Sequence, residues 1–252
     1  MNTPGDKYSP GSAELQLGSG AAAWTAPLRK APAQNAEREL GAPGVPSLNT
    51  PKGWYSRSYL PHRDEIGLIQ FLTFRLADSL PQKKLQQIED ELRFMPDEIR
   101  EIERSKRIEH WLDSGLGCCA LRHPHMAEMV EQALAHFDGQ RYRLMAWCIM
   151  PNHVHALIRP NKPLAGIVQS WKSFTGRWAL AHNTELALGI PGPAFWMREY
   201  WDRYMRDEHH FHRTVEYIHD NPVKAGLCAS PQAWPWSSAR HLLGTPSSGS
   251  AF

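Results

Sequence analysis

Apolar and polar positions follow two patterns along the chain, and these predict both strands and helices. Short apolar runs between turn residues are typical of buried strands, and three stretches have this form: 67–76, 142–150 and 153–159. Apolar residues that recur every three or four positions predict helices over 124–137, 164–182 and 209–220. Residues 196–205 fit either a strand or an extended segment. We expect the Asn221-Pro222 step to end the last helix, because the α region is disfavoured before proline.

A charged stretch over residues 81–113 interrupts this alternation. It holds nine acidic and seven basic residues around helically spaced apolar positions. The pattern predicts two solvated helices divided near Pro96, with Asp97 as the N-cap of the second. The order of elements favours an α+β fold of the ferredoxin-like type. We expect an antiparallel sheet with helices on one face and a helical insertion at about 81–118.

The composition predicts one domain with a tail. Residues 1–50 are rich in Gly, Pro, Ala, Ser and Asn and show no periodicity, which predicts disorder. We expect the domain over 51–245 and a disordered end over 246–252. No apolar run reaches the roughly 18 residues that a membrane helix needs, and the chain start lacks a signal pattern. The four cysteines form no C-x-x-C pair, which favours reduced thiols in a cytoplasmic protein without a membrane partner.

The formal net charge of +2 argues against a nucleic-acid partner until the position of the charges is considered. Residues 139–184 contain six cations and no Asp or Glu, with aromatic residues between them. Cations neutralise phosphates, and unpaired bases stack on aromatic rings. The span therefore favours a polyanion site, although ordinary surface cations around core aromatics would give the same composition.

Two pairs of residues carry candidate chemistry. His153 and His155 would point to the same face of a strand, with Cα atoms about 7 Å apart, and two such imidazoles can bind one divalent metal. Tyr217 and Asn221 are four residues apart and share a helix face. Simpler interpretations exist. His153 and His155 could be ordinary strand histidines, Tyr217 a packed aromatic side chain and Asn221 a C-terminal helix cap.

Several motifs together are more specific than the histidine pair. They are TFRLADSLP at 73–81, MPNHVHALI at 150–158, WKSFTGR at 171–177, FW-x-REYWDR at 195–203, YIHDNPVKAGL at 217–227 and WPWSS at 234–238. Over residues 54–240 the combination resembles the REP-associated tyrosine transposases. These belong to the single-tyrosine HUH nucleases, in which HUH means His-hydrophobic-His.

The resemblance implies a role for each candidate. His153 and His155 match the HUH metal ligands, and Asn221 takes the place of the third ligand. Tyr217 matches the nucleophile, and imidazole and amide ligands with open positions fit Mg²⁺ or Mn²⁺. DNA contacts are expected at five residues: Arg57, His62, Arg63, Lys172 and Arg177.

The implied activity is cleavage and rejoining of single-stranded, hairpin-flanked DNA through a 5′-phosphotyrosine intermediate, by a monomer or a homodimer. Tyr200 and Tyr204 are rival nucleophiles, but neither has a ligand-type residue four places later on a helix that ends at Asn-Pro. One alternative is a hairpin-DNA-binding protein that derives from a transposase and does not cleave. A second alternative is an RNA-processing enzyme or phosphodiesterase with the same fold, which would use two H-x-T/S motifs.

Overall fold

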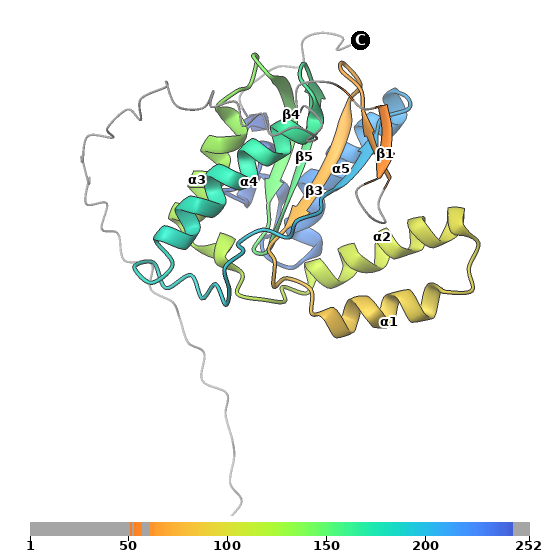
Figure 1. Ribbon diagram of the computed structural model, residues 1–252. Coiled ribbons are helices and arrows are strands. Elements are labelled where there is room, and N and C mark those ends of the chain that lie inside the picture. The colour runs from red at the N-terminus through yellow and green to blue at the C-terminus, as the bar shows by residue number, and fades with distance from the viewer. Residues whose placement is uncertain (1–50, 52, 57–60, 244–252) are drawn as a thin grey trace, which may run out of the picture. The chain divides into compact units, whose positions relative to one another are not determined.

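The computed structural model describes residues 51, 53–56 and 61–243, and a four-stranded sheet lies at its centre (Figure 1). The expected tail over 1–50 and the end over 246–252 lie outside these residues. The sheet comprises β3 (Gln70–Arg75), β4 (Tyr142–Ile149), β5 (His153–Pro160) and β6 (Trp201–Tyr204). Its order is β4-β5-β3-β6, and each pair of neighbours is antiparallel. The predicted α+β fold with a ferredoxin-like antiparallel sheet is confirmed.

Two helices pack on one face of the sheet. They are α3 (Pro124–Ala135), which follows the insertion, and α4 (Leu164–Ala181), which connects β5 to the segment before β6. Apolar side chains from alternate strand positions, among them Phe74, Val154 and Ala156, share one core with them. Because side chains alternate along a strand, the residues between these positions point to the opposite face.

The opposite face is covered by α5 (Glu208–Lys224), which lies behind the sheet in Figure 1. Phe71, Leu157 and Ile218 belong to this second core. The expectation of helices on one face therefore holds for α3 and α4 but not for α5. The reason lies in β5, which is buried at every position except the half-buried Arg159 and so needs cover on both faces.

Helix α5 differs from the prediction at its C-terminal end. It begins after Asp207, whose side chain accepts a hydrogen bond from the backbone N–H of His210, and it continues through Pro222 to Lys224. The expected break before Pro222 is wrong, because a proline so near the end removes only one intrahelical hydrogen bond. Gly226, with φ of +69°, follows this end.

The helical insertion consists of α1 (Gln82–Leu92) and α2 (Asp97–Asp113), which form a hairpin beside the sheet (Figure 1). The division at Pro96 is confirmed, but the N-cap of α2 is Pro96 rather than Asp97. Arg104 of α2 is buried and pairs with Glu89 of α1 at 2.6 Å. The insertion is therefore a packed unit rather than two independently solvated helices.

Short elements complete the described chain. A two-stranded sheet that the sequence did not predict joins β1 (Gly53–Ser56) and β2 (Pro61–Asp64). Short 3-10 helices lie at Ala120–Arg122, Pro231–Ala233 and Ser238–Leu243. All four cysteines are free thiols, as expected. Among the described residues, the helices are too short or too polar to cross a membrane.

Candidate metal and tyrosine site

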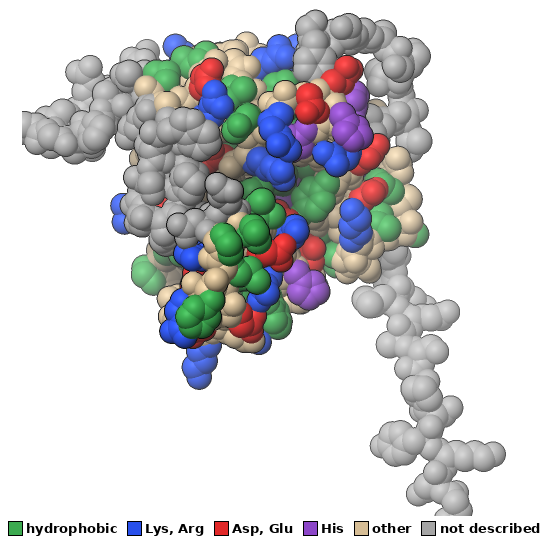
Figure 2. Space-filling view, turned by 90° about the vertical axis from the view of Figure 1, so that its right-hand side faces the viewer, with side chains coloured by type: hydrophobic (Ala, Val, Ile, Leu, Met, Phe, Trp, Pro, Cys, Tyr) green, Lys and Arg blue, Asp and Glu red, His purple; other side chains and the backbone are tan. Residues whose placement is uncertain are grey.

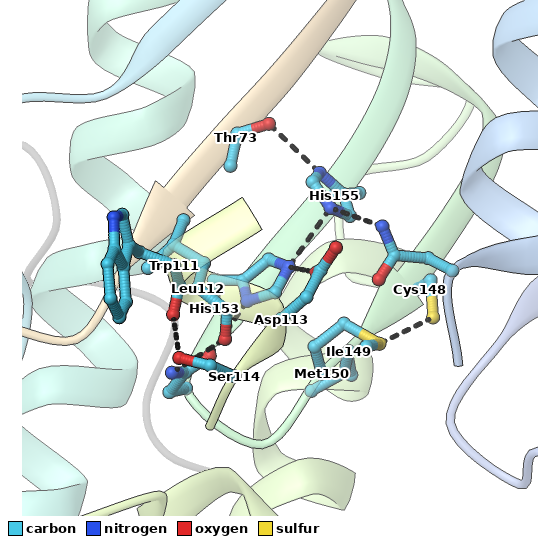
Figure 3. Close-up of polar contacts among 12 residues, drawn as sticks. Thr73, Trp111, Leu112, Asp113, Ser114, Cys148, Ile149, Met150, His153 and His155 are labelled. Atoms are coloured by element: carbon cyan, nitrogen blue, oxygen red, sulfur yellow. Dashed lines mark hydrogen bonds and ion pairs between the residues drawn. The ribbon is translucent and has the colours of Figure 1, made fainter. Parts of the chain in front are cut away.

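The two histidines of β5 lie on the sheet face that α5 covers. His153 and His155 are fully buried, and their Nε2 atoms are 3.0 Å apart. Their ring planes are inclined by 77° (Figure 3). The predicted same-face arrangement is therefore present, and the imidazoles turn toward one shared point.

Each imidazole is held by a polar partner on its other nitrogen. The Asn152 amide donates to the backbone carbonyls of Leu112 at 3.1 Å and Leu116 at 3.0 Å, which fixes Oδ1 as the atom 2.8 Å from His153 Nδ1. His153 Nδ1 must therefore be the donor, so its neutral ring presents an unprotonated Nε2 to the centre. His155 Nδ1 lies 2.9 Å from Thr73 Oγ1 (Figure 3). Such partners orient metal-binding histidines in proteins.

Burial also keeps these rings neutral. Desolvation lowers the pKa of His153 to about 3, and it lowers the pKa of His155 well below the ordinary value, with a further contribution from His153. Neutral imidazoles retain the lone pair that a metal needs.

Asn221 brings a third donor group to the same point. Its amide nitrogen is 3.2 Å from His155 Nε2, and its Oδ1 is buried without a hydrogen-bond partner among the described residues. Because amide oxygen and nitrogen can exchange places by rotation, Oδ1 can face the imidazoles. Ligands at right angles, each about 2.1 Å from a metal, lie about 3.0 Å apart. The donors of His153, His155 and Asn221 therefore fit Mg²⁺ or Mn²⁺. The interpretation of Asn221 as a C-terminal cap is wrong, because α5 continues to Lys224 and its C-cap is Ala225.

Tyr217 lies one helical turn before Asn221 and faces the same site. Its ring packs edge-on against Phe71 and His155, with centroid distances of 5.8 and 5.5 Å. Burial raises the pKa of its phenol, and the carboxylates of Glu109 and Asp113 raise it further. The Asn221 amide donates a hydrogen bond to the phenol oxygen and opposes that shift.

Two carboxylates of α2 belong to this site, and the sequence interpretation missed both. Glu109 accepts a hydrogen bond from Tyr217, and burial raises its pKa to about 7. Asp113 lies 3.9 Å from His153 Nε2 (Figure 3), and burial raises its pKa to about 6. Their spacing of four residues on one helix face was the available signal, but any solvated charged helix has the same pattern.

Comparisons with known proteins agree with this arrangement. Residues 121–221 match the model of the family described as "Transposase IS200 like". The REP-associated tyrosine transposase of Escherichia coli is 24% identical over 113 residues, which cover 44% of this chain and 63% of the relative. The predicted resemblance is confirmed. A Haemophilus influenzae protein named "Putative REP-associated tyrosine transposase" is 24% identical over 111 residues, 38% of this chain and 58% of that protein.

The matches cover only part of each compared protein. The aligned region spans less than two thirds of either relative. A solved REP-associated tyrosine transposase bound to a REP hairpin is 16% identical, with coverage of 73% of this chain and 84% of that chain and a TM-score of 0.46. The matched residues include the histidine pair, Tyr217 and Asn221, whereas the α1–α2 insertion precedes them.

The structure leaves the expected DNA contacts of Arg57, His62 and Arg63 untested. Arg57 lies outside the described residues, and of His62 only the backbone, in β2, is described. The Arg63 guanidinium pairs with Glu65 at 2.7 Å and lies over the Tyr204 ring. The predicted DNA contacts of these three residues therefore stay predictions.

Lys172 and Arg177 lie on α4, across the sheet from Tyr217. The Lys172 ammonium donates to the backbone carbonyls of Met197 and Arg198, each at 2.6 Å, and so ties α4 to the segment before β6. Arg177 is exposed and lines a groove together with Lys172. Phosphate contact by either residue stays a prediction.

Other cations lie closer to the tyrosine. Lys224 is 5.5 Å from the centre of the Tyr217 ring, and Arg203 is near enough to Glu109 to lower its pKa. Arg206 and Arg213 are near His210. Figure 2 shows Lys, Arg and His side chains close together on one face of the molecule, with acidic side chains among them. The acid-free span of 139–184 gave no signal for these cations, because they come from β6, α5 and the residues between them.

Proposed function

We propose that this chain is a metal-dependent DNA transposase that nicks and joins single-stranded DNA next to a hairpin. The observation that carries the proposal is the position of Tyr217. Its phenol lies one turn from Asn221 and packs against His155, so nucleophile and metal donors converge. The match of 121–221 to an IS200-like transposase family supports the same activity.

The reaction is a transesterification. Tyr217 Oη attacks the scissile phosphorus, the new O–P bond forms as the bond to the 3′-oxygen breaks, and the 3′-oxygen leaves as a hydroxyl after it gains a proton. The 5′-phosphotyrosine retains the bond energy, so another 3′-hydroxyl can reverse the step and join strands. Mg²⁺ or Mn²⁺ bound at His153, His155 and Asn221 would polarise a non-bridging phosphate oxygen.

The protein groups around Tyr217 have separate tasks in this proposal. The Glu109 carboxylate holds the phenol oxygen in place and is positioned to accept its proton. Lys224 and Arg203 lie where phosphates on either side of the scissile bond would approach. We propose that the protein works in the cytoplasm, as a monomer or a homodimer.

A trapping experiment tests the nucleophile. The full chain is incubated with a hairpin oligonucleotide labelled at both ends and Mn²⁺, and covalent adducts are separated on a denaturing gel. We expect one labelled strand to be attached to the protein, and Tyr217→Phe to abolish the adduct while hairpin binding persists. The matched control is Tyr204→Phe, which should leave the adduct intact.

The outcome also separates the alternatives. EDTA and His153→Ala should each abolish the adduct, because the phosphate oxygen then loses its electrophilic partner. An adduct that persists in Tyr217→Phe would refute the mechanism. Salt-sensitive hairpin binding without any adduct in the wild type would favour the non-catalytic DNA-binding protein.

A further inference from the structure

A pocket lies between the helical insertion and the edge of the sheet at β6. Its walls come from α1 and α2 on one side, and from β3, β6 and the segment before β6 on the other. The volume of the pocket is about 60 Å³, several times the roughly 10–15 Å³ that one water molecule needs. The pocket therefore has room for a group of several atoms.

Two residues of the pocket wall also contact the groups of the candidate site. Glu109 of α2 lines the pocket and accepts the hydrogen bond of the Tyr217 phenol. Thr73 of β3 lines it as well, and its hydroxyl lies 2.9 Å from His155 Nδ1. The pocket is thus separated by a single side chain from the nucleophile on one side and from a histidine of the pair on the other.

Trp201 gives the pocket an aromatic wall. It pairs with Thr73 across the β3–β6 ladder, and residues directly opposite each other on antiparallel strands point to the same face. The Trp201 ring packs edge-on against Phe71 with a centroid distance of 5.6 Å, and Phe71 packs in the same way against Tyr217. Trp201 is half-buried, so its ring keeps a surface on which a planar ligand can stack.

The remaining walls combine apolar side chains with charged groups of both signs. Leu85, Ile108 and Met197 are apolar, whereas Arg75 and Glu199 carry opposite charges. A guanidinium group only donates hydrogen bonds, and an ionised carboxylate only accepts them. Apolar walls with a few polar groups are typical of a ligand site. A nucleobase fits such walls, because it has a flat apolar face and both donors and acceptors at its edge.

We propose that this pocket binds the base of a nucleotide next to the scissile phosphate, so that the helical insertion takes part in the choice of the cleavage position. The inference rests on the proposed function, because Tyr217 defines which phosphate is cleaved. The base and phosphate of one nucleotide are joined by a single sugar, so a base held in the pocket keeps its phosphate near the phenol. Both helices of the insertion precede the family-matched residues 121–221, and the family match does not assign this pocket.

A scan with abasic nucleotides tests the inference by binding alone. The full chain with Tyr217→Phe is titrated with fluorescent hairpin oligonucleotides, in each of which a different single-stranded nucleotide lacks its base, and fluorescence anisotropy gives the Kd. We expect one position at which the missing base raises the Kd by about tenfold or more, as the loss of a base–aromatic stack does. The length of the fragment that the wild type releases when it forms the adduct then shows whether this nucleotide adjoins the cleaved phosphate.

Substitutions in the wall connect the sensitive position to the pocket. Leu85→Trp fills the pocket from α1, so it should weaken binding of the complete oligonucleotide and remove its advantage over the abasic one. Gln86→Trp is the matched control at the next, exposed position of α1 and should keep the tenfold difference. Trp201→Leu removes the stacking surface and should also reduce the difference, while the Kd for the abasic oligonucleotide stays the same. A general loss of folding would instead weaken the binding of both oligonucleotides.

The possible results separate the pocket from the reaction. A scan in which neither nucleotide beside the cleaved phosphate is sensitive overturns the inference and leaves the proposed function in place. A full difference that persists in Leu85→Trp also overturns it, because the base is then bound elsewhere. A base effect that disappears in Leu85→Trp, in a protein whose wild type forms no adduct, refutes the proposed function and supports the nucleobase pocket.

Discussion

Asn152 connects the two parts of the site at the scale of single residues. Its amide group donates to one carbonyl in the last turn of α2 and to one just after α2, and its carbonyl oxygen accepts from His153. It is fully buried, so no water can replace these partners without opening the core. One side chain thereby fixes both the tautomer of His153 and the end of the insertion.

Replacement of Asn152 by Ala should therefore affect binding and stability together. We expect the Kd for Mn²⁺ to rise by about 10- to 100-fold, because His153 loses the partner that orients it. The free energy of unfolding should fall by about 1–3 kcal/mol, because buried carbonyls lose their donor. Calorimetry and denaturant unfolding measure the two effects. The control is Asn161→Ala at an exposed position just after β5, and an equal loss in that variant would contradict the role of Asn152.

Residues close in sequence could be predicted as parts of the site, and residues distant in sequence could not. Alternation along a strand places His153 and His155 on one face, and helical periodicity does the same for Tyr217 and Asn221. Asp113 reaches the site only because α2 folds back over a sequence distance of 40 residues to Asn152. A single sequence holds no pattern for that contact, since an exposed acidic helix would look the same.

At the scale of elements, the loop from α2 to α3 decides where the insertion lies. Gly117 has φ of +89°, and a Cβ there would lie 2.8 Å from the backbone oxygen of Asp78. The next residue, Cys118, donates its backbone N–H to the Asp78 carboxylate at 2.6 Å. The loop is thus pressed against the end of the segment that follows β3, in a conformation that favours glycine.

This close approach predicts a large effect of one methyl group. Gly117→Ala should lower the free energy of unfolding by about 1–3 kcal/mol, because the left-handed backbone and the contact with Asp78 are both strained. Gly192→Ala is the matched control, since its φ is ordinary and its Cβ would meet nothing within 4 Å. Chemical denaturation measures both variants. Equal free energies of unfolding of the two variants would show that the loop adapts to the added methyl group, which would contradict the prediction.

Element boundaries show which signals in the sequence are dependable. Apolar periodicity located α3, α4 and the strands β4 and β5 within a few residues, because their buried faces are continuous. Proline was a weaker guide, because Pro222 lies inside the last turn of α5. The sequence did not predict the β1–β2 pair, since each strand has only four residues and carries neither strand periodicity nor a long apolar run.

At the scale of the whole molecule, cations divide between the two faces of the sheet. The acid-free span predicted a polyanion surface, but its Lys172 is engaged with backbone carbonyls on the α4 face. Lys224 and Arg203 lie on the α5 face beside Tyr217. In the proposed reaction, DNA must reach Tyr217 from this second face. The net charge of +2 averages over both faces.

The salt dependence of hairpin binding shows which face the DNA contacts. Each phosphate contact contributes about 0.7 to 0.9 to the slope of log affinity against log salt. Lys224→Ala should lower the slope by that amount. It should also weaken the binding of hairpins of different sequence to a similar extent. Lys162→Ala is the control, because Lys162 is exposed beyond the end of β5 that is opposite His153.

The comparison of these slopes also tests where the strand lies during cleavage. If Arg177→Ala on α4 lowers the slope while Lys224→Ala leaves it unchanged, the measured contacts belong to the hairpin on the α4 face, and Lys224 does not hold the scissile strand.

If both slopes fall, the DNA contacts both faces, and a duplex must pass around an edge of the sheet. Since β4 and β6 are the edge strands, and β6 carries Arg203, the edge at β6 is the one that leads from the α4 groove to Tyr217. Arg203→Ala should then lower the slope together with Lys224→Ala.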